Sequence, residues 1–558
     1  MSDEQTGPEV VEKKPPKARK RKVREDADDG RVLKLSWNLH ELPSSQHKAG
    51  LAGLALCVQF LERKPDRKGT CSIECIDENG LTLAVDRDGM QSLFDDVYDA
   101  SLEEKEQKTI RKKGKGDQKQ DDPPKRVETR EIVDGKTHKA KTVQLFIYDQ
   151  VVPRGSFIDE LDTGSDGKKL WLKLWRDLVW STLRAVPATR EPYDARAEER
   201  FLSDGGDAWE ALAQAPGKGV ELPSTYAIGA QAKSAEDVPF RDVERYRFLL
   251  HFWPFATSIY VPATLDRDGQ RDFNGFAVVV PDVGTLDAFV EEWPAVARGR
   301  GSEASGYRPR EAIIDVPGEA GLDVFRRCLD VIAQKQGSTR TKDWLVAADV
   351  FHLEREGNNV RLRSIARIDP ERRMVDEYAR VRGAYWSPVF RRQRIGSLLE
   401  NKPWWWGFAR LCSVTSETMT IKHDPFRRDC RVALTEVEMN QDVSDSEQTL
   451  EHLIFKRIQA YVLGKTERKY ELSWSKVQGN QAQEKEYREK KEKVGREAFL
   501  AIRSRTGPDF VAYFTSTICS VPHFSSEEKY LVVARALMDP KEVERVRSLT
   551  LLALSAVA

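Results

Sequence analysis

The chain has 558 residues, enough for roughly three to four domains, and its 90 basic side chains balance 90 acidic ones, so that the formal net charge is zero. A free-standing DNA-binding protein is usually basic overall, so the balance favours local basic patches or a subunit whose partners supply positive charge. No apolar run approaches the about 20 residues that span a bilayer, no hydrophobic signal peptide is evident, and seven cysteines without regular spacing indicate reduced thiols, so a cytoplasmic protein without membrane contact is expected.

The first 30 residues predict a disordered basic tail. Residues 13–24 (KKPPKARKRKVR) contain eight cations and no acid. A block of like charges repels itself and stays extended. Non-specific phosphate affinity, a nuclear-import signal and a solubilising tail are equally compatible with this segment.

Folded sequence begins at residue 31 with a predicted strand at 32–37 and a helix at 44–64. Gly50 and Gly53 weaken that helix, so close packing against a neighbour is the expected compensation. Strands at 71–76 and 81–85 follow, joined through Asn79-Gly80, a strong hairpin signal. A further helix is predicted at 89–104.

Residues 105–126 form a charged segment with almost no aliphatic side chains, and a disordered loop is predicted there. Beyond it, a turn at Asp134-Gly135 leads into a strand at 142–151. The following elements alternate between helix and antiparallel strand: helices at 166–186 and 285–296, a polar helical region at 193–219, and paired strands at 247–261 and 273–280. Residues 31–440 are therefore predicted to form an α+β body.

A third hairpin is predicted from strands at 344–353 and 360–368. In its second strand Arg361, Arg363 and Arg367 alternate onto one face. A row of guanidinium groups can follow the phosphates of DNA, although the same row can be ordinary solvent-facing charge.

Residues 379–410 carry the strongest signal for nucleic acid. Seven basic residues stand against one acid, and aromatic side chains are interleaved with them, including the run Trp404-Trp405-Trp406. Guanidinium groups neutralise phosphates and flat rings stack on unpaired bases. The candidate contacts are Arg391, Arg392, Arg394 and Lys402, with Trp404 or Trp406 as the stacking residue. In the alternative interpretation the tryptophans are core and the arginines form a solvated rim.

From about residue 444 the pattern is helical only, and residues 444–558 predict a C-terminal bundle of about five helices. Apolar side chains at 510, 513, 514, 517, 518 and 521 follow a helical period. Gly464 is a plausible end of the first helix. The bundle's cations, among them Arg496, Arg503 and Arg505, are expected on exposed faces.

Catalytic constellations were not found. No phosphate-binding G-x-x-x-x-G-K-[ST], no G-x-S-x-G and no H-E-x-x-H occurs. His423-Asp424 has no second histidine within 28 residues, and Cys71 and Cys75, expected on one face of a strand, lack two further ligands at close spacing. No catalytic residue, metal or cofactor is therefore expected, although an enzyme built from scattered carboxylates stays open.

Three stretches together resemble a known family: LSWNLHELPSSQHKAGLAGLAL (35–56), YAIGAQAKSAEDVPF (226–240) with LLHFWPF (249–255), and FLAIRSRTGPDFVAYFTSTICSVP (499–522). They are similar to the large subunit of type I CRISPR surveillance complexes (Cascade), in its MYXAN subtype. The similarity covers most of the chain from residue 33 onward and excludes the basic tail and the 105–126 loop.

The resemblance implies a non-catalytic subunit with an α+β body and a C-terminal helical bundle. Its implied partners are a guide RNA, target DNA, other Cascade subunits and a helicase–nuclease recruited in trans. Its implied role is recognition of the protospacer-adjacent motif in duplex DNA and assistance to strand opening. Two rival hypotheses are a metal-dependent nuclease that uses scattered Asp and Glu, and a scaffold that binds only protein.

Overall fold

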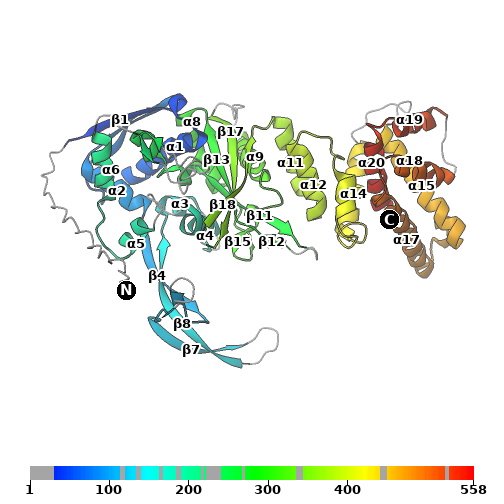
Figure 1. The fold of residues 1–558 in the computed structure, drawn as a ribbon, viewed down its shortest axis with the longest axis horizontal. Helices are drawn as coiled ribbons and strands as arrows, with labels where there is room; N and C mark the ends of the chain where they lie inside the picture. The colour runs from blue at the N-terminus through cyan, green and yellow to red at the C-terminus, as the bar shows by residue number, and fades with distance from the viewer. Residues whose placement is uncertain are drawn as a thin grey trace, which may run out of the picture.

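The computed structural model describes residues 31–113, 120–133, 140–162, 167–183, 190–214, 219–221, 241–266, 271–334, 344–357, 359–439, 449–521 and 527–558. The molecule is elongated, with a mixed α+β body at one end, a purely helical region at the other and a β-arm that projects from the body (Figure 1). This arrangement confirms the predicted α+β fold class. The predicted basic tail, residues 1–30, lies outside the described residues.

The N-terminal part is a small sheet against a buried helix. Strand β3 (Gly80–Val85) lies between β1 (Leu33–Asn38) and β2 (Cys71–Ile76), and both pairings are antiparallel. Helix α1 (Ser45–Glu62) begins after the capping side chain of Ser44. A Cβ built on Gly53 would lie 2.1 Å from the carbonyl oxygen of Phe252. The glycines of α1 thus permit the close packing that their sequence predicted.

Strand β2 corrects the expectation that Cys71 and Cys75 share a face. The register of β2 against β3 shifts between Ile73 and Cys75, which marks a β-bulge. An extra residue reverses the alternation of side chains beyond it. Cys71 is consequently buried and Cys75 exposed.

The projecting arm is a three-stranded sheet in the order β4-β8-β7, built from β4 (Ala100–Gln107), β8 (Ala140–Pro153) and β7 (Arg126–Val133) (Figure 1). The helix expected at 89–104 is instead α2 (Arg87–Val97), and residues 100–107 pair with β8 along its length. The disordered loop predicted at residues 105–126 is therefore wrong at its two ends, which belong to β4 and β7. Within it, residues 112–113 and 120–121 pair as β5 (Lys112–Lys113) and β6 (Gln120–Asp121). Residues 114–119 lie outside the described residues.

Short helices connect the arm to the central sheet. They are α3 (Ser156–Leu161), α4 (Leu170–Leu178) with the π-helical Val179–Leu183, α5 (Glu191–Ala197), α6 (Asp204–Ala213), α7 (Glu244–Leu249) and a 3₁₀ turn at Trp253–Ala256. The strand expected at 247–261 is wrong in its first half. Phe248, Phe252 and Trp253 are buried in helical turns next to α1, because aromatic runs serve helical cores as well as strands.

The central sheet follows the order β12-β11-β13-β17-β18. Its strands are β12 (Arg271–Phe273), β11 (Ser258–Leu265), β13 (Phe276–Val283), β17 (Leu345–Glu356) and β18 (Asn359–Ile368), and β16 (Ile313–Ile314) pairs with β11. Helix α9 (Glu319–Gln334) packs on it, and α8 (Leu286–Arg298) packs on α1 and α9. Two-stranded pairs are formed by β9 (Val220–Glu221) with β10 (Arg241–Asp242), and by β14 (Ala304–Ser305) with β15 (Arg308–Pro309). The predicted β17–β18 hairpin is confirmed.

The helical region begins before residue 444. Its helices are α11 (Arg372–Ala384), α12 (Pro388–Leu399), α13 (Phe408–Val414), α14 (Asp424–Met439), α15 (Leu450–Tyr470), α16 (Trp474–Val477), α17 (Gln481–Arg503), α18 (Gly507–Ser516), α19 (Glu527–Met538) and α20 (Val543–Val557). Helix α15 continues past Gly464, so the predicted stop is wrong. A Cβ there would meet Val521 at 2.9 Å, which shows that this glycine serves packing.

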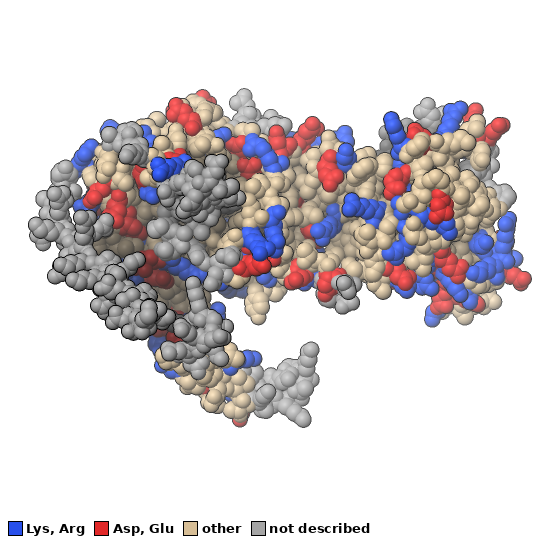
Figure 2. All heavy atoms as spheres, in the orientation of Figure 1, with Lys and Arg blue, Asp and Glu red and all other residues tan. Residues whose placement is uncertain are grey.

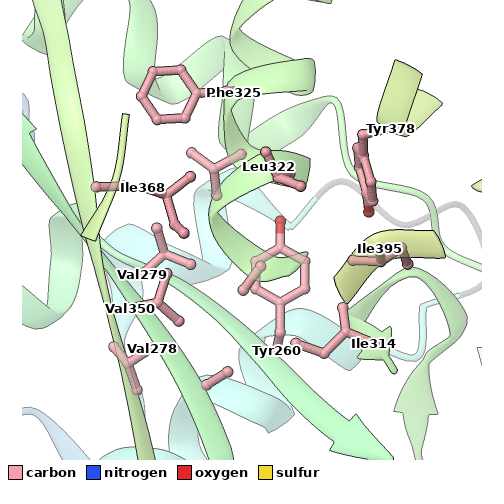
Figure 3. Packing of buried hydrophobic residues seen from close by; sticks show 14 of the residues in the cluster. Tyr260, Val278, Val279, Ile314, Leu322, Phe325, Val350, Ile368, Tyr378 and Ile395 are labelled. Carbon is pink, nitrogen blue, oxygen red and sulfur yellow. The ribbon is translucent and has the colours of Figure 1, made fainter. Parts of the chain in front are cut away.

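One continuous core joins the body to the helical region. Figure 3 shows Tyr378 of α11 and Ile395 of α12 next to Tyr260 and Ile314 of the central sheet. Further along, the rings of Phe408 of α13 and Phe426 of α14 stack, and Phe390 of α12 meets both of them edge-on. Helix α20 packs on α13 and α14 as well as on α15 and α17. Contacts of the C-terminal bundle therefore cross the boundary predicted at residues 440–444.

Candidate nucleic-acid interface

The segment 379–410 spans the end of α11, all of α12 and the turn that leads into α13. The side chain of Ser387 caps α12 and Pro388 follows at its first turn, so the local sequence determines where this helix begins. A helix that is packed on one side presents only part of its circumference to solvent. The three predicted arginines of α12 therefore face different surroundings, and Lys402 lies beyond the end of the helix.

Arg391 and Arg394 point inward. Arg391 pairs with the buried carboxylate of Asp315; burial by itself lowers the pKa of this arginine, but the charge and hydrogen bond of Asp315 outweigh that effect and raise it. Arg394, 7% exposed, donates to Glu377 at 3.2 Å, and its guanidinium lies 5.7 Å from the ring centre of Trp404. Neither arginine is a solvated rim residue, which corrects that alternative interpretation for this pair.

Arg392 and Lys402 are exposed, as a contact with nucleic acid requires. The ammonium group of Lys402 lies 5.5 Å from the ring of Trp406, which is itself 44% exposed. Trp404 is half-buried and packs against the core. The structure thus separates the predicted residues into an outer pair, Lys402 with Trp406, and an inner pair, Arg394 with Trp404.

The inner pair lines a cavity of about 230 Å³ between α11, α12 and α14, called here the Arg394 pocket. Its polar and aromatic lining residues are Arg373, Glu377, Arg380, Tyr385, Arg394, Trp404 and Glu436. The hydroxyl of Tyr385 donates to Glu436 at 2.8 Å, and burial raises the pKa of that phenol well above its usual value. A pocket that contains arginines, carboxylates and rings can bind a flat polar ligand by hydrogen bonds and stacking.

Arg361, Arg363 and Arg367 lie on β18, the edge strand of the central sheet, and all three are exposed. The prediction that they share one face is wrong, because the register of β18 against β17 shifts between Leu362 and Ser364 and an extra residue reverses the alternation of side chains. Each also has an acidic partner on the sheet: Glu356 for Arg361, Glu354 for Arg363, and Asp282 with Asp349 for Arg367. Asp282 also accepts from Lys48 of α1 at 2.8 Å. Arg367 therefore ties β18 to β13, whereas the first two form exposed pairs that contribute little to stability.

We expect replacement of Arg361 and Arg363 with Ala to weaken duplex DNA binding and to lower the salt-dependence slope by up to about two units, since each lost phosphate contact removes about 0.9. Fluorescence anisotropy with a labelled duplex across a salt series measures the slope. Arg372→Ala, which removes an exposed arginine from α11, is the matched control. An unchanged slope in the double variant would identify these residues as ordinary surface charge.

Two exposed aromatic sites were missed by the sequence analysis. Trp386 is 64% exposed, and the guanidinium of Arg428 lies 3.8 Å from its ring centre. Tyr307 is 91% exposed in the turn between β14 and β15, after Gly306 with a φ of +63°. The Gly306-Tyr307 turn, flanked by Arg308 and Arg310, is a signal in the sequence that could have revealed the second site.

Charges of both signs cover the face shown in Figure 2, without a large area of one sign. The described residues contain no group of three or more Asp, Glu, His or Cys side chains placed to hold a metal ion. Asp424 is exposed and pairs with Arg427, which lowers its pKa. Among the helices that are described, none is long and apolar enough to cross a membrane.

Helix α9 carries buried acids that hold α11 to the body. Glu319 accepts from the backbone nitrogen of Asp315 at 2.7 Å and from the hydroxyl of Tyr378 at 3.2 Å. Burial, and then the charge of Asp315, raise the pKa of Glu319 to about 7. Arg391 and Arg382 oppose this shift but do not cancel it.

This pKa predicts a pH dependence of stability. Because the folded-state pKa of Glu319 lies above its unfolded value of 4.5, its contribution is largest below pH 4.5 and is lost as the pH rises through about 7. The unfolding free energy of the wild-type protein should therefore fall by up to about 3 kcal/mol between pH 4.5 and about 7. In Glu319→Gln, which mimics the neutral acid, this decrease should be absent. Urea denaturation at pH 5 to 8 measures the difference. Parallel pH profiles for the two proteins would contradict the assignment.

The fold and site define a class: an elongated α+β protein with a helical extension and paired cations and rings where the two regions meet. Comparison with family models matches residues 70–338 to the type I-B CRISPR Cas8b N-terminal domain and residues 345–557 to the type I-B CRISPR Cas8b C-terminal domain. The two matches together cover most of the chain, which therefore belongs to the Cas8b family and is a large subunit of a type I-B CRISPR system. No curated protein matched the chain.

Proposed function

We propose that the chain recognises the protospacer-adjacent motif in duplex DNA, assists strand opening and recruits a helicase–nuclease, without catalysing a reaction itself. Its proposed partners are a guide RNA, target DNA and other Cascade subunits in the cytoplasm. The observation that carries the proposal is the match of two consecutive Cas8b domain models along the chain. The MYXAN subtype stays a prediction, since the matched models specify type I-B.

Tyr307 supports a role in strand opening. The hairpin β14–β15 presents this ring to solvent, while Arg308 beside it is held over Phe273 at 4.7 Å. An aromatic or apolar side chain can enter between base steps and unstack them for a few kcal/mol. Exchange of a DNA duplex for an RNA–DNA hybrid is nearly balanced in free energy, so a contribution of this size affects whether opening begins.

The assembled complex, with guide RNA and the other subunits, provides the test. Tyr307→Ala should retain binding to a duplex that contains the motif but lower the permanganate reactivity of the opened strand. Phe201→Ala is the control, because Phe201 is also highly exposed, at 82%, but lies outside this hairpin. Equal permanganate reactivity in wild type and Tyr307→Ala would exclude the insertion of Tyr307 between base steps. Binding that does not depend on the motif would contradict the proposed recognition.

The helical region is proposed to hold the opened strands. The three cations named in the sequence analysis do not all serve this role: Arg503 is half-buried and donates to the carbonyl oxygens of Ser413 and Thr415, and Arg505 pairs with Asp509. Lys485, Arg488 and Lys493 are exposed on α17 instead. Their replacement with Glu should lower the yield of strand-opened complex while duplex recognition persists, because contacts with a displaced strand form only after opening.

The rival functions make different predictions. A metal-dependent nuclease would cleave DNA or RNA with Mg²⁺ or Mn²⁺ and lose that activity in His423→Ala or Asp424→Ala, whereas we expect no cleavage by the isolated chain. A scaffold that binds only protein would show no salt-dependent binding to DNA. A pull-down that recovers a guide RNA would support the surveillance complex over both.

A further inference from the structure

The Arg394 pocket contains an unsatisfied donor. Arg394 is 93% buried, given its 7% exposure, and uses its terminal nitrogen for Glu377, but its Nε has no hydrogen-bond partner among the described residues. A buried polar group without a hydrogen-bond partner destabilises the folded protein. A ligand that supplies an acceptor at this position would remove that destabilisation.

Two arginines at the rim of the pocket also lack ion pairs among the described residues. Arg373 and Arg380 of α11 line the pocket and are exposed, and neither forms an ion pair within the described parts of the chain. They are seven residues apart, with Glu377 between them, and this spacing places all three on one face of the helix. The contacts of Glu377 and Glu436 with Arg394 and Tyr385 use one oxygen of each carboxylate.

We propose that the Arg394 pocket binds one unpaired nucleotide of a single-stranded nucleic acid. The phosphate lies at Arg373 and Arg380, and the base enters beside Trp404, where its acceptor receives the Nε hydrogen bond of Arg394. The volume of about 230 Å³ lies below the about 300–1,000 Å³ of typical small-molecule sites, which suits a single nucleotide rather than a duplex.

The carboxylates determine which bases fit. An ionised carboxylate only accepts hydrogen bonds, and an exocyclic amine offers two N–H donors, so Glu377 and Glu436 favour adenine, cytosine and guanine over uracil and thymine, which offer one ring N–H. An inorganic anion would use the rim arginines but would leave Trp404 and both acids without a role. This chemistry is common to RNA and DNA, and 2′-hydroxyl donation to a free carboxylate oxygen would favour RNA.

This inference rests on the proposed function for the source of the nucleotide, which is either the guide RNA or an opened DNA strand. The binding event itself does not require the complex. Failure of motif recognition in the assembled complex would therefore leave pocket binding by the full-length chain intact, and the two proposals fail separately.

The test uses the full-length chain and fluorescein-labelled hexanucleotides, (dA)6, (dC)6, (dT)6 and their RNA counterparts, in anisotropy titrations. Arg373→Ala with Arg380→Ala should lower the salt-dependence slope by about 0.7, because both arginines contact the same phosphate and one single-strand phosphate contact contributes about 0.7. Trp404→Leu should weaken binding about 5- to 100-fold, the range for loss of one stacked base, while Trp404→Phe retains most of the affinity.

Arg372→Ala is the matched control, since Arg372 is exposed on the same helix but does not line the pocket. Circular dichroism melting of each variant separates lost binding from lost folding. Stronger binding of (dA)6 and (dC)6 than of (dT)6, abolished in the rim variant, would support the proposal. Equal loss in Arg372→Ala, indifference to base, or competition by inorganic phosphate as strong as by adenosine monophosphate would overturn it.

Discussion

Replacement of Asp323 with Ala is expected to lower the free energy of unfolding by about 3–5 kcal/mol, because it removes one partner from a buried charge network. Asp323 is fully buried in α9. Its carboxylate accepts from Arg327 and from Arg382, each at 2.8 Å, and from the hydroxyl of Tyr260 at 2.9 Å. These arginines, with Arg326, hold the pKa of Asp323 well below its usual value despite the opposing effect of burial.

The effect should be both local and long-range. Arg327, 4% exposed, would keep a buried charge with one acidic partner fewer, and Arg382 would lose its connection from α11 to α9. Urea denaturation followed by circular dichroism measures the change in unfolding free energy. Asp330→Ala is the control, because Asp330 pairs with Arg326 at 56% exposure and should change stability by less than about 1 kcal/mol. Similar stabilities for the two variants would show that the network contributes no special stability.

Truncation after Met538, which removes α20, is the second change expected to lower stability strongly. Leu549, Leu551, Leu552 and Leu554 are each at most 1% exposed, and full burial of one such side chain is worth roughly 1.5–3 kcal/mol. Loss of all four approaches the about 5–15 kcal/mol that stabilises a typical domain. The truncated helical region should therefore unfold, since α13, α14, α15 and α17 all pack on α20.

Limited proteolysis and far-ultraviolet circular dichroism report the outcome. We expect rapid cleavage throughout the C-terminal helices and a loss of helical signal, while fragments of the sheet-containing body resist proteolysis longer. A chain that ends after Tyr530 should behave in the same way, whereas Glu544→Gln, an exposed change on α20, should not. Resistance of the truncated chain equal to that of the full chain would contradict the central position of α20.

Local patterns predicted much of the architecture. Turn signals such as Asn79-Gly80 located hairpins, and apolar periodicity located most helices of the C-terminal region, because both depend on neighbours in the sequence. The predictions of secondary structure failed where pairing with a strand distant in the sequence overrode the local pattern. Residues 100–107 form a strand because β8, about 40 residues later, supplies their hydrogen-bond partners. The β-bulge in β2 is likewise a property of the pairing with β3 rather than of β2 alone.

The candidate interface was predicted in composition but not in arrangement. Sequence identified the unusual mixture of cations and rings at 379–410, but it could not show that Arg391 turns to Asp315 while Arg394 turns to Glu377. The acids that bind these arginines are 76 and 17 residues away from them, respectively. Arg380 lies in this segment and Arg373 just before it. Neither was singled out, because an exposed arginine on a helix is common and only the pocket brings the two together.

The sequence by itself determined the α+β class, the helical C-terminal region and the resemblance to CRISPR large subunits, since these depend on periodicity, turn chemistry and strings of residues. Only the tertiary structure decided which cations are available to a ligand. A guanidinium on a helix reaches either solvent or a buried acid according to which element packs beside it, and that neighbour is chosen by the continuous core that joins α9, α11 and α12. The same packing leaves the Nε of Arg394, a residue that lines the pocket, without a hydrogen-bond partner among the described residues.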